Sequence, residues 1–72
     1  MNPDIRLLDV VAVTVDLPQQ GLVRGQVGTV VEILGPAAYE VEFSDEDGQT
    51  YAEAALPGHQ LMVLRYHPEL AS

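Results

Sequence analysis

The chain has 72 residues, enough for one domain, and no cysteine, which excludes disulfides, thiolate nucleophiles and cysteine-ligated metal sites. Its formal net charge is −8, from eleven Asp and Glu residues against three Arg residues, so nucleic acids and anionic membranes are not expected as partners. The sequence shows neither a signal-peptide pattern nor an apolar run of membrane-spanning length, and we therefore expect a cytoplasmic protein.

The apolar residues form short runs between proline and glycine clusters, a pattern that predicts β-strands instead of helices. The first predicted strand covers residues 8–15 and places Val15 on the same face as the preceding odd-numbered valines. A turn that begins at residues 17–21 interrupts this strand, because its proline cannot donate a hydrogen bond to a ladder. The second predicted strand covers residues 26–34, and Gly28 inside it indicates a bulge or a sharp bend.

The next segment shows the clearest alternation, because apolar side chains occupy the odd positions of residues 39–44 and polar ones the even positions. This pattern predicts a half-buried strand with Tyr39 in the core. An Asp-Gly pair follows, which predicts a hairpin to a fourth strand over residues 49–56. Residues 57–60 are expected to form a 3₁₀ turn before a last strand over residues 61–64.

Five strands with short connections must curl around one interior, because a flat sheet would leave its apolar face in water. The sequence therefore predicts an all-β fold: a small, five-stranded, partly open barrel that makes residues 1–72 a single domain, with its core within residues 8–65. Leu17, Pro18 and Leu22 of the long turn are expected to cover one end of the barrel. The side chains expected on the inner face are Val11, Val13, Val27, Val30, Ile33, Val41, Phe43, Leu56, Leu61 and Val63.

Two stretches of the sequence resemble known SH3-like barrels. An Arg-Gly-x-x-Gly-x-Val pattern at residues 24–30 and a Tyr-x-Val-x-Phe strand at residues 39–43 are similar to the barrel of the nitrile hydratase β-subunit. Together with the Leu-Asp-Val-Val start at residues 8–11 and the Asp-Leu-Pro-x-x-Gly-Leu turn at residues 16–22, they resemble a family of small bacterial proteins, domain-of-unknown-function family 4926. The resemblance implies an SH3-like barrel over residues 8–64, with a long diverging turn before the glycine-containing strand, and no assigned activity.

Side chains able to carry out chemistry are few and unfavourably spaced. Asp45 and Asp47 supply only a fragment of a calcium loop, and a solvated hairpin tip is the other interpretation. His59 and His67 lack the spacing of zinc ligands, and no hydroxyl residue lies next to a His with a carboxylate behind it. We therefore expect a protein that is not an enzyme and has no metal or cofactor. The alternative is a small-molecule or metal-binding sensor at His59 and the acidic loop.

The glutamates of the strands are the strongest candidates for a binding surface. Alternation places Glu40 and Glu42 on the outer face, and Glu53 is expected on the neighbouring strand of the same hairpin. Like charges on neighbouring strands are unfavourable, so this face serves either solubility or a basic partner that neutralises it. The residues of this candidate partner-binding site are Glu32, Glu40, Glu42, Asp45, Asp47 and Glu53. A strip of tyrosines, as in SH3 domains that bind proline-rich peptides, is a second candidate surface, although Tyr39 is expected in the core.

These observations favour a non-catalytic protein-interaction module whose acidic surface binds a basic protein. Its specific form would be an antitoxin-like or immunity-like role toward a partner encoded beside it. The alternative is an accessory or structural subunit of a larger enzyme, as the nitrile hydratase resemblance implies. An edge strand could also pair two copies of the chain, which leaves a homo-oligomer open.

Overall fold

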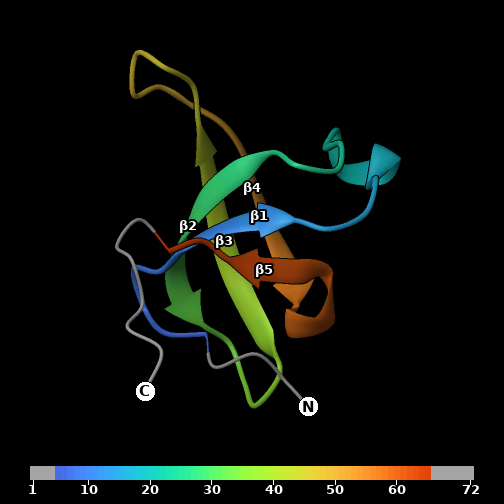
Figure 1. Ribbon diagram of the computed structural model, residues 1–72, viewed down its shortest axis with the longest axis vertical. Coiled ribbons are helices and arrows are strands. Elements are labelled where there is room, and N and C mark those ends of the chain that lie inside the picture. The colour runs from blue at the N-terminus through green and yellow to red at the C-terminus, as the bar shows by residue number, and fades with distance from the viewer. Residues whose placement is uncertain (1–4, 66–72) are drawn as a thin grey trace.

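The computed structural model describes residues 5–65, which form one antiparallel sheet (Figure 1). The predicted all-β class is confirmed, because the described residues form five strands and two 3₁₀ turns. The strands are β1 (Val10–Val13), β2 (Val27–Ile33), β3 (Ala38–Ser44), β4 (Thr50–Pro57) and β5 (Leu61–Val63). The two 3₁₀ turns are η1 (Pro18–Gln20) and η2 (Gly58–Gln60).

The strands follow one another in the order β4-β3-β2-β1-β5 across the sheet, and each neighbouring pair is antiparallel. β2, β3 and β4 form a meander, while β1 lies between β2 and β5. Because β4 and β5 remain at the two edges, the sheet curls around its core without closing (Figure 1). This is the partly open SH3-like barrel that the sequence predicts, with the long turn between β1 and β2 and with η2 directly before β5. Among residues 5–65, no helix has the length and apolar character needed to cross a membrane.

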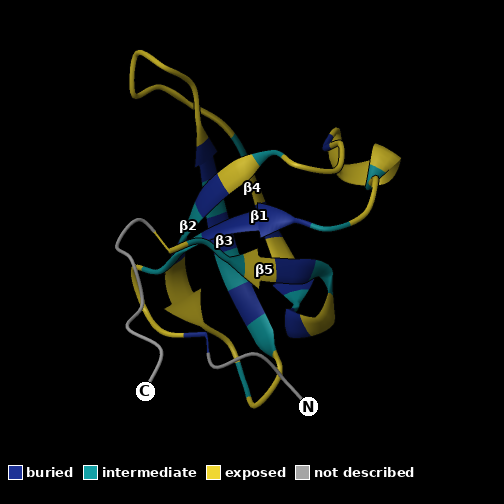
Figure 2. Cartoon of the chain, in the orientation of Figure 1, coloured by how far each residue is buried: buried dark blue, intermediate teal, exposed yellow. Residues whose placement is uncertain are grey.

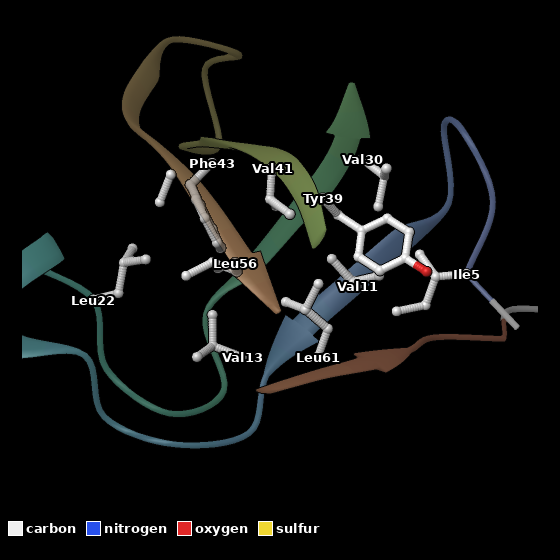
Figure 3. Close-up of a cluster of buried hydrophobic side chains, with 11 residues drawn as sticks. Ile5, Val11, Val13, Leu22, Val30, Tyr39, Val41, Phe43, Leu56 and Leu61 are labelled. Atoms are coloured by element: carbon white, nitrogen blue, oxygen red, sulfur yellow. The ribbon is translucent and has the colours of Figure 1, made fainter. Parts of the chain in front are cut away.

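The core lies inside the curled sheet and receives side chains from all five strands (Figure 3). Tyr39, Val41 and Phe43 alternate with outward-facing residues along β3, and all three are buried, as the period-two pattern predicts. Val30 of β2 is fully buried opposite Val41. The buried cluster consists of Ile5, Val11, Val13, Leu22, Val30, Tyr39, Val41, Phe43, Ala54, Leu56 and Leu61.

Two residues of β2 that we expected inside the barrel are exposed. Val27 faces outward because the next residue, Gly28, occupies the inward position opposite Phe43. Ile33 pairs with the buried Tyr39 after a register shift, but it is exposed because the strand ends at this residue. Gly28 has no side chain to reveal which face it belongs to, so the pattern of large apolar residues gave the wrong alternation here.

The first and last strands are shorter than predicted. β1 ends at Val13, so Val15 belongs to the long turn and is exposed instead of facing the core. β5 ends at Val63, which is half-buried and packs against the core, as expected of an inner-face residue. Edge positions such as these lose contacts on one side, and alternation alone does not locate the end of a strand.

The long turn between β1 and β2 folds back on itself and covers one end of the barrel. Leu17 and Leu22 exchange two backbone hydrogen bonds, with N–O distances of 2.8 and 3.0 Å. Leu22 is buried and Leu17 packs against the core, as predicted, whereas Pro18 is exposed. The backbone N–H of Arg24 donates to Asp16 Oδ1 at 2.9 Å, which holds the two arms of the turn together.

Candidate functional site

The strand glutamates gather on the outer face of the meander formed by β2, β3 and β4. Glu40 and Glu42 point outward because Val41 between them points into the core. Glu53 on β4 lies directly opposite Glu42, and Glu32 on β2 lies directly opposite Glu40. We call these four residues the acidic face. Glu32 and Glu53 are exposed, while the two glutamates of β3 are half-buried.

The strand register therefore places like charges directly opposite each other in two pairs, Glu42 with Glu53 and Glu32 with Glu40. Side chains directly opposite in an antiparallel pair have Cβ atoms about 5 Å apart, and like charges in this arrangement are destabilising by a few tenths of a kcal/mol. The five strands contain four glutamates and no Lys, Arg or His. The sequence has no Lys, the three arginines are at positions 6, 24 and 65, and His59 belongs to η2. The acidic face thus has no basic residue within its own sheet.

The two aspartates of the candidate set lie apart from the acidic face, in the β3–β4 hairpin. Asp45 Oδ1 accepts hydrogen bonds from the backbone N–H groups of Asp47 and Gln49, at 2.9 and 3.0 Å. The N–H of Gly48 donates to the Asp45 carbonyl at 3.0 Å, and Gly48 has a φ of +80°, which favours glycine. Asp45 therefore shapes the turn, while Asp47 remains exposed at its tip.

The alternative of a metal sensor depended on His59 and the acidic loop. His59 is exposed in η2, and His67 lies outside the described residues. Within residues 5–65, no three His, Cys, Asp or Glu side chains are placed to hold a metal ion together. The candidate site of the described chain is therefore the acidic face.

The tyrosines do not line one exposed strip. Tyr39 is buried in the core, where its ring lies beside Ile5 (Figure 3). Tyr51 is exposed on β4, and its hydroxyl accepts a hydrogen bond from Gln26 Nε2 at 3.2 Å. This contact links β4 to the long turn, whereas Tyr66 lies outside the described residues. The prediction of an aromatic strip is therefore wrong for Tyr39, and the expectation that Tyr39 belongs to the core is confirmed.

The structure defines a small all-β module, an open five-stranded SH3-like barrel with carboxylates on the outer face of its meander. The sequence model of the family described as Domain of unknown function (DUF4926) matches residues 7–63, a range that contains all five strands. The chain belongs to this family, as its motifs indicate. No curated protein and no solved structure matches the chain, and the likeness to the nitrile hydratase barrel stays a prediction.

Proposed function

We propose that this chain is a non-catalytic protein-interaction module that binds a basic protein through its acidic face. The observation that carries this proposal is the register, which pairs Glu42 with Glu53 and Glu32 with Glu40 on a sheet without basic residues. A partner that places Lys or Arg side chains over these pairs would remove a repulsion present in the free protein. Binding would therefore gain both the new ion pairs and the relief of the old repulsion.

The charge of the whole chain supports the same proposal. With a formal net charge of −8 on 72 residues, the protein attracts cationic partners over a distance of about one Debye length. Complementary charge of this kind mainly accelerates encounter and makes affinity fall as salt is added. The same charge opposes association with nucleic-acid phosphates, which we leave out of the proposed partners.

A small acidic module that covers a basic surface can neutralise the protein it binds, so we propose an antitoxin-like or immunity-like function toward a protein encoded beside it. Asp47 at the hairpin tip would extend the negative surface toward such a partner. We also propose a cytoplasmic setting, because a cysteine-free chain does not use the disulfides that stabilise many small secreted domains.

The test is a binding titration of the full chain with a synthetic peptide of alternating Lys and Ser, measured by fluorescence anisotropy at several salt concentrations. Glu42→Gln should weaken binding by about 1.5-fold to fivefold, the range of an exposed ion pair. The matched control is Glu46→Gln, which removes the same charge from the hairpin tip and should have a smaller effect.

Equal losses in the two variants would show that only net charge matters and would contradict a defined site. An affinity that is unchanged by salt and by both substitutions would refute the acidic face as a binding surface. A complex with those properties would favour the alternative, an accessory subunit held by apolar contacts.

A further inference from the structure

The chain displays two leucines in a tight turn just before β1. The turn over residues 6–9 is closed by the N–H of Asp9, which donates to the Arg6 carbonyl at 3.1 Å. Asp9 Oδ2 in turn accepts a hydrogen bond from the Arg6 N–H at 2.9 Å. Leu7 and Leu8, the two central residues, are both exposed, and 68% of the Leu8 surface is accessible. The sequence pattern assigned Leu8 to a strand and gave no sign of this turn.

Leu8 has a backbone conformation that suits glycine and not leucine. Its φ is +70°, and it is the one described residue other than glycine with a positive φ. Left-handed φ values bring Cβ of a bulky residue close to its own backbone, which is unfavourable. A leucine so exposed recovers little of this energy by burial. Strained residues of this kind cluster at binding and active sites, so we expect the side chain of Leu8 to have a role other than stabilising the fold.

Further exposed aliphatic side chains lie beside this turn. The N–H of Leu8 donates to the carbonyl of Val30 at 2.7 Å, which holds the turn against the middle of β2. Figure 2 shows the exposed part of this turn next to the exposed end of β2. The group, which we call the apolar rim, consists of Leu7, Leu8, Val31, Ile33 and Leu34. Single exposed apolar residues are common, but a group of neighbouring ones is typical of an interaction site.

The apolar rim adjoins the acidic face along the chain, at Glu32. Glu32 lies between Val31 and Ile33 in β2, and Glu40 faces it across the β2–β3 ladder. A second copy of the chain would bring like charges together here, because each copy has a net charge of −8. Charge complementarity instead selects a partner segment with aliphatic or aromatic side chains next to Lys or Arg.

We propose that the apolar rim anchors an amphipathic basic segment of the partner protein, with Leu8 held in its strained conformation as part of the anchor. This inference rests on the proposed function and deepens it, since it names the chemistry of the segment that the acidic face attracts. The glutamates supply charge recognition, and the rim supplies the apolar contact that purely electrostatic binding lacks.

The test compares two synthetic peptides of about 18 residues, which as helices would have about five turns. One is an amphipathic Leu/Lys peptide, and the other has the same lysines with every Leu replaced by Ser. The full chain should bind the Leu/Lys peptide at least about tenfold more tightly at equal salt. Leu8→Gly should remove most of this preference and leave the affinity for the Leu-free peptide unchanged.

Leu8→Gly also separates binding from folding, because glycine adopts this φ without strain. Its melting temperature should equal or exceed that of the unmodified protein, so a loss of binding cannot be ascribed to unfolding. The control variant is Val23→Ser, which removes another well-exposed aliphatic side chain, 58% accessible, from the long turn. This variant should leave the preference intact.

The inference is refuted if Leu8→Gly and Leu7→Ser bind the Leu/Lys peptide as tightly as the unmodified protein while Glu42→Gln binds it more weakly. It is also refuted if Val23→Ser loses as much as Leu8→Gly, since the preference would then reflect general adhesion. If Glu42→Gln binds both peptides unchanged, the proposed function itself fails. The two failures are therefore distinct.

Discussion

Gly28 allows the packing of the barrel to be tested with a single methyl group. It is buried in β2 opposite Phe43. A Cβ atom at this position would lie 2.7 Å from Val41 Cγ1, 2.8 Å from the Glu42 carbonyl oxygen and 2.9 Å from Phe43 Cδ2. Favourable carbon contacts lie at about 3.5–4.0 Å, so all three distances are too short. The carbonyl belongs to the backbone of β3 and cannot move unless the β2–β3 pairing moves with it.

We expect Gly28→Ala to lower the free energy of unfolding by about 1–3 kcal/mol, the usual cost of overpacking a core. A domain of 72 residues is stable by about 4–11 kcal/mol, so this is a substantial part of the total. For a domain of this size, each kcal/mol lowers the melting temperature by about 4–8 °C. Thermal and urea unfolding followed by circular dichroism would measure the loss.

The matched control is Gly35→Ala. A Cβ atom at Gly35 would meet nothing within 4 Å, and its φ lies outside the left-handed region. This variant should be unchanged or more stable by up to about 1 kcal/mol, because alanine restricts the unfolded chain. Two results would refute the proposed packing of β2 on β3. One is a Gly28→Ala protein with the melting temperature of the unmodified protein, and the other is a Gly35→Ala protein that loses as much stability as Gly28→Ala.

Four further substitutions, one of them a control, test the core, the hairpin and the acidic face. Phe43→Ala removes a fully buried ring and should cost about 3–5 kcal/mol, so much of the protein should be unfolded by circular dichroism; an unfolding transition close to that of the unmodified protein would contradict its place in the core. Asp45→Ala loses two hydrogen bonds to the turn and should cost about 1 kcal/mol in urea unfolding, whereas Asp47→Ala should stay within about 0.5 kcal/mol; equal effects would argue against the turn geometry. Glu42→Gln relieves the repulsion with Glu53 and should raise stability by a few tenths of a kcal/mol at low salt. That gain should shrink in about 1 M NaCl, and a loss of stability at low salt would count against the pairing.

The sequence predicts β3 well because one of its faces is dry and the other is wet. Residues 39–44 were expected as a strand, and β3 runs over Ala38–Ser44 with Tyr39, Val41 and Phe43 buried. Period-two burial specifies the register of such a strand strongly, because a slip of one residue would expose every apolar side chain. The Asp-Gly pair likewise indicates the hairpin, since it supplies the positive φ that the turn requires.

The sequence predicts β2 less well because its inward positions carry little signal. Gly28 points inward but has no side chain, and the register shift between Val30 and Glu32 changes the alternation afterwards. The shift depends on how β2 pairs with β3, a long-range property that the local pattern does not contain. Val27 was misplaced because of Gly28, whereas Ile33 pairs with Tyr39 and is exposed because β2 ends at this residue.

The candidate site, like the fold, could be predicted only in part. Alternation predicts that Glu40 and Glu42 face outward, because each neighbours a buried residue on β3. Which glutamate faces which is set by the registers of two ladders, and the sequence did not determine them. The strained φ of Leu8 was also beyond prediction, since the apolar run that follows over residues 10–13 indicates a strand.

The central claim is that the outer-face glutamates, and not net charge alone, contact a basic partner. The most direct test is a map of amide NMR chemical-shift changes during titration of the full chain with the peptide of alternating Lys and Ser. The proposed function predicts the largest changes at Glu40, Glu42 and Glu53, with smaller ones at residues 45–48. Changes confined to the hairpin tip or to the long turn, or spread evenly over all carboxylates, would contradict it.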